Sequence, residues 1–143
     1  MRAVAIVTLA ALAACTDVRD YAGAWDGPRV GDSAVLQLGV VRDATARLTI
    51  EEIDKHGLRG RLSVTGLADD VAIASVEGAE ADVLAGISFA GSPLRVYLAF
   101  APTGDGGGDT LAVIALYDDE RIEVRLLRGG AAPVYAIFAL RPL

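Results

Sequence analysis

The apolar residues of this chain fall into short runs rich in Val, Ile, Leu and Tyr. Turn signals separate the runs at intervals of about 8–12 residues, which is typical of an all-β sandwich or barrel. No stretch keeps the period of a capped amphipathic helix. The expected strands are Ala22–Asp26, Ala34–Val41, Arg47–Ile53, Leu58–Thr65, Val71–Val76, Asp82–Ala90, Leu94–Ala101, Thr110–Tyr117, Arg121–Leu127 and Val134–Arg141.

Several runs alternate between apolar and polar positions, as a strand with one buried face does. From Arg121 to Leu126 the apolar residues take one face and the charged residues the other. In the run from Leu94 to Phe100, one face carries Leu94, Val96, Leu98 and Phe100, and the other carries Arg95, Tyr97 and Ala99. We therefore expect these aliphatic faces to be the buried ones.

The run Arg47–Ile53 changes phase near its end. Leu48 and Ile50 share a face, but Ile53 is an odd number of residues further along. One extra residue at Glu51–Glu52 restores the alternation, and such an insertion is a β-bulge. The sequence therefore predicts a bulge at this point, with two cross-strand pairs: Leu48 opposite Leu62 and Ile50 opposite Gly60.

Two of the expected strands, Thr110–Tyr117 and Val134–Arg141, are apolar on both faces. An antiparallel sheet with one wet side does not need this pattern. Three explanations remain open from the sequence: cover from elsewhere in the fold, a contact in an oligomer, or proximity to a membrane.

The N-terminal residues 1–14 begin with Arg2 and continue as an apolar, alanine-rich run. A positive start, a short apolar core and small residues before a cleavage point are typical of a secretory signal peptide. The run is too short to span a bilayer, which needs about 20 apolar residues. The alternative is a buried N-terminal strand with an incidental cysteine.

Leu12-Ala13-Ala14-Cys15 follows this apolar run and resembles the bacterial lipobox. The resemblance implies cleavage before Cys15, a diacylglycerol group on its sulfur and an acyl chain such as palmitate on its amine. It divides the chain into a signal peptide (residues 1–14), a lipidated N-terminus with a short tether (15–20) and a β-barrel domain (21–143). Thr16 stands where lipoproteins retained in the inner membrane often carry Asp, so the resemblance favours the outer membrane.

The composition of the chain limits the classes of molecule that it is expected to bind. The chain carries a formal net charge of −6, so as a whole it is a poor candidate for binding nucleic acid or anionic headgroups. Cys15 is the only cysteine, and the exported fold must therefore stand without disulfides. The hydrophobic fraction is high largely because of alanine, and it does not indicate a further membrane segment.

Catalytic chemistry has little support in the sequence. His56, the single histidine, stands beside Gly57 in a predicted turn. The carboxylates gather beside predicted turns, where they are solvated: Glu51, Glu52 and Asp54; Asp69 and Asp70; Asp118, Asp119 and Glu120. The Gly- and Asp-rich stretch 103–110 lacks EF-hand spacing and is expected to be a hairpin loop. We therefore expect no enzyme, no cofactor and no metal.

Gly23-Ala24-Trp25 opens the domain, and Arg141 lies near its end. This G-x-W with a late arginine resembles the calycin group of lipocalins and avidins. The resemblance implies that Trp25 plugs one end of a barrel and that Arg141 packs on the indole, as a barrel-closing pair. The Thr-Asp-Tyr loop motif of lipocalins and the helix after the last strand are missing, and no ligand contacts carry over from avidins.

The sequence predicts an all-β fold, an antiparallel up-and-down barrel of eight to ten strands, with an antiparallel β-sandwich as the alternative. The expected function is that of a membrane-anchored lipoprotein of the bacterial cell envelope. It would act as a small non-enzymatic binding module for a small apolar ligand. The alternative is a filled barrel with no ligand, which binds another envelope protein through its outer surface.

Overall fold

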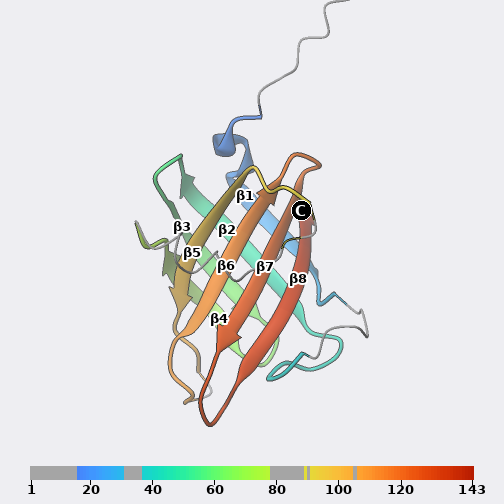
Figure 1. Ribbon diagram of the computed structural model, residues 1–143, viewed down its shortest axis with the longest axis vertical. Helices are drawn as coiled ribbons and strands as arrows, with labels where there is room; N and C mark the ends of the chain where they lie inside the picture. The colour runs from blue at the N-terminus through green and yellow to red at the C-terminus, as the bar shows by residue number, and fades with distance from the viewer. Residues whose placement is uncertain (1–15, 31–36, 78–88, 90, 105) are drawn as a thin grey trace, which may run out of the picture.

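The computed structural model describes residues 16–30, 37–77, 89, 91–104 and 106–143. Within these residues the chain forms eight antiparallel strands in a nearly closed up-and-down barrel (Figure 1), which confirms the predicted fold class. A short 3-10 helix, η1, precedes the strands. The elements are η1 (Val18–Tyr21), β1 (Gly23–Pro28), β2 (Thr45–Ile53), β3 (Leu58–Val64), β4 (Ala68–Ala74), β5 (Arg95–Ala101), β6 (Thr110–Tyr117), β7 (Arg121–Arg128) and β8 (Val134–Pro142).

The sheet order is β4-β3-β2-β1-β8-β7-β6-β5, so all neighbours are consecutive hairpins except β1 and β8. The first and last strands pair with Trp25 opposite Pro142, as the sequence predicted for a closed barrel. Between β4 and β5 the described residues form isolated contacts instead of a continuous ladder of hydrogen bonds. Ser75 forms an isolated bridge with Ala99, and the Val76 amide donates to the Leu98 carbonyl at 2.8 Å.

The predicted bulge in β2 is confirmed with its register. Leu48 lies opposite Leu62 and Ile50 opposite Gly60, and the pairing then shifts between Ile50 and Glu52. Because Glu51 is the extra residue, both Ile50 and Ile53 point into the core and are buried. The phase of the apolar residues therefore set this register correctly.

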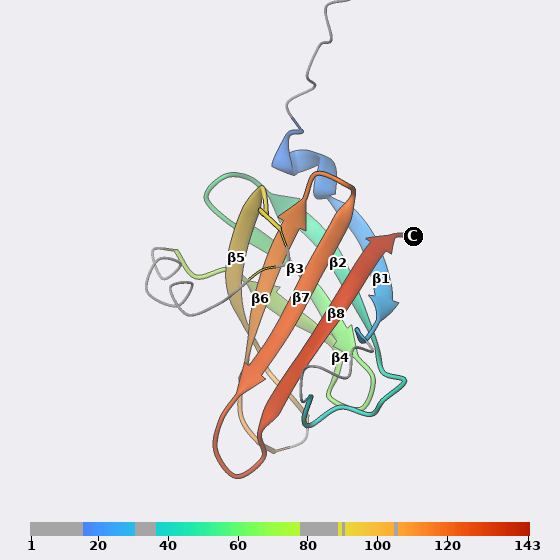
Figure 2. The same cartoon turned by 45° about the vertical axis from the view of Figure 1, so that its right-hand side comes forward.

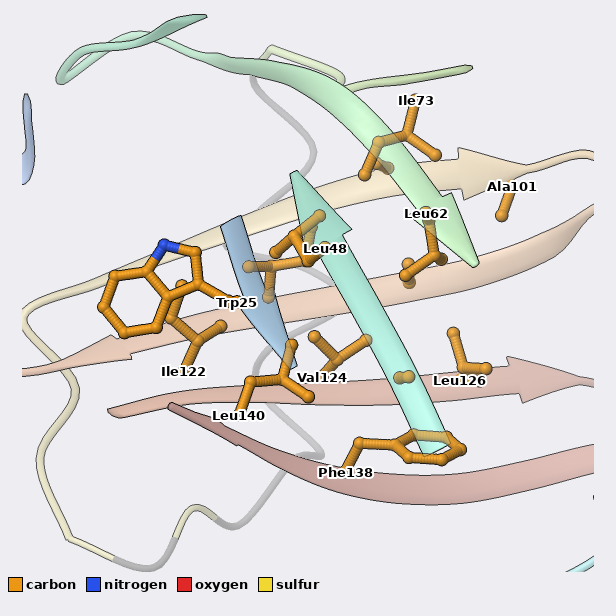
Figure 3. Close-up of a cluster of buried hydrophobic side chains, with 14 of the residues drawn as sticks. Trp25, Leu48, Leu62, Ile73, Ala101, Ile122, Val124, Leu126, Phe138 and Leu140 are labelled. Carbon is orange, nitrogen blue, oxygen red and sulfur yellow. The ribbon is translucent and has the colours of Figure 1, made fainter. Parts of the chain in front are cut away.

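The interior of the barrel is filled by its own side chains (Figure 3). An eight-stranded barrel is just wide enough for side chains to fill. Phe138, Leu48 and Leu62 are at most 1% exposed, and their neighbours in the cluster come from every strand. Among the labelled members are Trp25, Ile73, Ala101, Ile122, Val124, Leu126 and Leu140.

The predicted face of β5 is wrong. Tyr97, Ala99 and Ala101 belong to the inner cluster, whereas Phe100 is 52% exposed on the outer face. The prediction placed the larger apolar side chains inside, but the side chains of neighbouring strands already occupy most of the space inside the barrel beside β5. Small alanines and one tyrosine fit there, next to the bulky side chains of β6 and β7.

The outer face of β6 is buried as well as its inner face. Val113 and Ala115 are 0% exposed although they point away from the inner cluster. Phe89 lies beside this outer surface, with its ring centroid 5.1 Å from the Arg125 guanidinium carbon on β7. Cover within the chain therefore explains why β6 is apolar on both faces.

Two expected strands do not add to the eight. For Ala34–Val41, residues 34–36 lie outside the described residues, and Leu38 forms only an isolated bridge with Tyr135. Asp82–Ala90 lies outside the described residues except for Phe89. Among the helices of the described part, none has the length and apolar character to cross a membrane.

The barrel has two ends, and the views in Figures 1 and 2 agree on which segments lie at each. The N-terminal end carries η1, the β2–β3 turn (residues 54–57), the start of β5, the β6–β7 turn (118–120) and Leu143. The far end carries the described residues 37–44 of the β1–β2 connection, the described residues of the β5–β6 turn and the β7–β8 turn.

Candidate functional site

The 3-10 helix η1 is fastened to the barrel by two aromatic side chains. The Tyr21 hydroxyl donates to the carbonyl oxygen of Tyr117 at the end of β6. The Trp25 indole Nε1 donates to the Tyr21 carbonyl at 2.9 Å, and the two rings stack with centroids 5.4 Å apart. Because Tyr21 and Trp25 are both buried, they hold the end of η1 against the barrel.

The described residues begin next to the candidate lipidation site. Asp17 caps η1, with its carboxylate accepting from the Arg19 amide at 3.0 Å. Residues 18–20, which the sequence assigned to the tether, are the first residues of η1. Cys15 itself lies outside the described residues, and only Thr16 stands between it and the capping residue.

A pocket of about 520 Å³ lies between η1 and the end of the barrel. Its lining includes the aromatic pair Tyr21 and Trp25, the C-terminal residues Pro142 and Leu143, and three carboxylates, Asp20, Asp118 and Glu120. Burial, and secondly the Asp118 carboxylate, raises the pKa of the Tyr21 hydroxyl above its usual range. The pocket is therefore lined by apolar residues and carboxylates together.

The predicted contact between Trp25 and Arg141 is wrong, although their strands are neighbours. Arg141 lies opposite Asp26, one position away from the residue that faces Trp25, so it points to the outer face. Its guanidinium binds the β6–β7 turn instead, at the Asp119 carboxylate (3.3 Å) and the Glu120 carbonyl (3.2 Å). The aromatic partner of Trp25 is Tyr21.

His56 is an exposed turn residue, as expected. The Asp54 carboxylate accepts from the amides of His56 (2.7 Å) and Gly57 (3.0 Å). These two backbone bonds hold the pKa of Asp54 below its usual range. Asp54 and His56 therefore shape a hairpin turn at the N-terminal end.

Two of the other candidate carboxylates, Glu52 and Asp70, take part in exposed ion pairs. Glu52 pairs with Arg59 across the β2–β3 hairpin, and Asp70 pairs with Arg61 across β3–β4. The side chains in these pairs are between 42% and 68% exposed, so each contributes little to stability. Within the described residues, no group of three or more His, Cys, Asp or Glu side chains could hold a metal ion.

Sequence reasoning missed a buried ion pair on β7. Glu123 is 5% exposed and pairs with Arg125, whose guanidinium also faces the Phe89 ring. The alternation in Arg121–Leu126 assigned both charges to the solvent side. The available signal was the doubly apolar β6, because a covered outer face on β6 extends over its neighbour β7.

At the far end, Arg128 holds the loop of residues 103–110. Its guanidinium donates to the Thr103 hydroxyl at 2.8 Å and to the Gly108 carbonyl at 3.2 Å. Asp105 lies outside the described residues. The described part of this loop is thus tied down by an arginine from the neighbouring hairpin.

Comparison of the chain with protein-family models, with curated proteins and with solved structures finds no match.

Proposed function

We propose that this chain is a lipid-anchored lipoprotein of the bacterial cell envelope, attached through Cys15. The observation that carries the proposal is Leu12-Ala13-Ala14-Cys15 at the end of an apolar run with a single preceding charge. The fold is compatible with this arrangement, because η1 begins at Val18, three residues after Cys15. Thr16 favours the outer membrane.

The proposed role of the domain is non-enzymatic binding through its outside. Among the described residues the inner cluster is almost fully buried, and a barrel packed in this way leaves no room for a ligand on its axis. Binding to another envelope protein is therefore the role that the geometry supports best. The exposed apolar side chains Phe100, Val41 and Leu143 offer contact points.

A second candidate is binding of a small apolar ligand at the N-terminal end. The pocket of about 520 Å³ beside Trp25 and Tyr21 supports it, and its size falls within the usual range for ligand sites. This candidate places the ligand beside the barrel end rather than inside the barrel. Trp25 is the single tryptophan, so its emission would report occupancy directly.

The test is mass spectrometry of the protein purified from its native envelope. Lipidation predicts a chain that begins at Cys15 and carries diacylglycerol and acyl mass, and Cys15→Ser should abolish both the mass and the cleavage. A wild-type chain that retains residues 1–14 and takes up no labelled fatty acid would refute the anchor. A co-purified small molecule that perturbs Trp25 emission would favour the second candidate, and a co-purified protein the first.

A further inference from the structure

One side of the N-terminal end combines two cations with an exposed leucine. The Arg95 guanidinium donates to the carbonyl of Lys55, which joins the start of β5 to the β2–β3 turn. The Tyr97 hydroxyl donates to the Asp54 carbonyl at 2.6 Å and fixes the same junction. Leu94 stands beside them and is 43% exposed. We call Lys55, Leu94 and Arg95 the cationic rim.

Lys55 and Arg95 of the cationic rim differ from several other strand arginines in their interaction partners. Arg47, Arg59 and Arg61 pair with carboxylates on neighbouring strands. Across the described residues, neither Lys55 nor Arg95 forms an ion pair with an Asp or Glu. In an acidic protein, two adjacent cations without carboxylate partners are available to an anionic surface.

The β6–β7 turn at the same end is acidic, and it lies next to the start of β5, because the Leu94 amide donates to the carbonyl of Leu116 near the end of β6 at 2.7 Å. The β6–β7 turn carries Asp118, Asp119 and Glu120, and Asp20 of η1 lines the pocket beside it. Asp119 is partly neutralised by Arg141 and Arg121. An anionic surface placed against this end would attract Lys55 and Arg95 and repel the neighbouring β6–β7 turn, so charge favours contact through the cationic rim.

The anchor brings such a surface within reach. Two residues, Thr16 and Asp17, separate Cys15 from η1, and an extended chain spans about 3.3–3.6 Å per residue. A lipidated Cys15 would hold the N-terminal end of the barrel about 10 Å from the headgroups. Lys and Arg side chains are attracted to anionic lipid headgroups, and an exposed leucine can enter the interface.

We propose that the cationic rim rests on the phospholipid headgroups of the membrane that holds the anchor, with Lys55 and Arg95 on lipid phosphates and Leu94 at the interface. This inference rests on the proposed lipid anchor. It adds an orientation, in which the far end of the barrel points away from the membrane and is presented to partners.

Cys15 is the only native cysteine. When lipid occupies its sulfur, a cysteine introduced elsewhere is the single site for a thiol-reactive probe. Full chains carrying Leu94→Cys or Val41→Cys are purified from membranes, labelled with a thiol-reactive fluorophore and reconstituted in phosphatidylglycerol–phosphatidylethanolamine vesicles that contain headgroup-spin-labelled lipid. Val41 is the matched control, because it is also an exposed aliphatic residue but lies at the far end. We expect quenching at position 94 to exceed that at position 41 several-fold.

Charge reversal at Lys55 distinguishes the contribution of the cationic rim from that of the lipid anchor. Lys55→Glu keeps the backbone carbonyl to which Arg95 donates, and it should reduce quenching at position 94 while the chain stays on the vesicles. Equal quenching at the two positions, or quenching at position 94 that Lys55→Glu leaves unchanged, would overturn the proposal. Failure of the anchor has a different signature, since an unlipidated wild-type chain takes up the thiol probe at Cys15.

Discussion

Gly27 of β1 lies against the backbone of Ala139 on β8, so closely that a Cβ at Gly27 would overlap the Ala139 carbonyl oxygen and lie 3.0 Å from the Leu140 Cα. The contact is made by backbone atoms, which cannot swing aside as a flexible side chain can. The joint between the first and last strands therefore requires glycine at this position.

Gly27→Ala should loosen the joint between β1 and β8. We expect a loss of at least about 1–3 kcal/mol in the free energy of unfolding, because the added methyl forces the two backbones apart. Urea denaturation followed by Trp25 emission measures the loss. Gly129→Ala is the control, since nothing lies within 4 Å of a Cβ there. Equal stability of the two variants would contradict the tight joint.

The aromatic pair at the N-terminal end should behave as one unit. Trp25→Ala should cost about 3–5 kcal/mol, because it leaves a cavity at the end of the inner cluster. Tyr21→Phe should cost about 0.5–1.5 kcal/mol through the lost bond to the Tyr117 carbonyl. Tyr21→Ala and Trp25→Ala should be non-additive, since they remove one shared stacking contact.

Arg141 supplies the control for this cycle. Its guanidinium binds the β6–β7 turn and not the indole, so Arg141→Ala and Trp25→Ala should add within about 0.5 kcal/mol. A coupling energy clearly above this limit would restore the sequence-based pairing of Trp25 with Arg141 and contradict the geometry of the outer face.

Single-residue deletions test the bulge in β2. Removing Glu51 leaves Ile50 opposite Gly60 and restores regular pairing, so every apolar residue keeps its face and the barrel should fold. Removing Thr49 shifts the phase, which turns Ile50 outward and places Glu51 inside the barrel. Burying an unpaired carboxylate is costly, and this variant should be unfolded or much less stable by circular dichroism and urea denaturation. Similar stability of the two deletions would refute the assigned register.

Stability should fall at alkaline pH. Burial is the first cause that raises the pKa of Tyr21, Tyr97 and Tyr117. Tyrosines in the unfolded chain lose their protons near pH 10, before those in the fold do. The unfolded state then binds fewer protons than the folded state, so the free energy of unfolding decreases as pH rises above about 10 and is unaffected at neutral pH.

Tyr117→Phe is the informative variant for this effect. Among the described residues its buried hydroxyl has no hydrogen-bond partner, so its removal should cost little at neutral pH and should flatten the alkaline loss. Urea midpoints measured on both sides of pH 10, alongside tyrosinate absorbance, provide the readout. An unchanged slope in Tyr117→Phe would show that the other tyrosines carry the effect.

Sequence reasoning succeeded where a local pattern determines structure on its own. The phase of Leu48, Ile50 and Ile53 fixed the bulge and the register of β2 on β3, because side chains alternate strictly along a strand. The closure of β1 on β8 followed from the requirement that a barrel leave no edge between them. Both inferences depend only on backbone periodicity.

It failed where the answer depends on packing between distant segments. The inner face of β5 is Tyr97, Ala99 and Ala101 because of the space left by neighbouring strands, which hydrophobicity alone does not reveal. Glu123 and Arg125 alternate like solvated charges, yet they are buried on an outer face. Arg141 could reach either a ring or a turn, and the sequence does not say which.

The strand order also has a kinetic consequence. Each half of the barrel, β1–β4 and β5–β8, is a run of consecutive hairpins whose contacts are local, whereas β1 and β8 are separated by most of the chain. Local contacts form before distant ones, because the entropy of closing a long loop must be lost before the distant contacts stabilise the chain. We expect the two halves to form early and the joint at Gly27 to form late. Gly27→Ala would then speed unfolding while leaving the folding rate nearly unchanged.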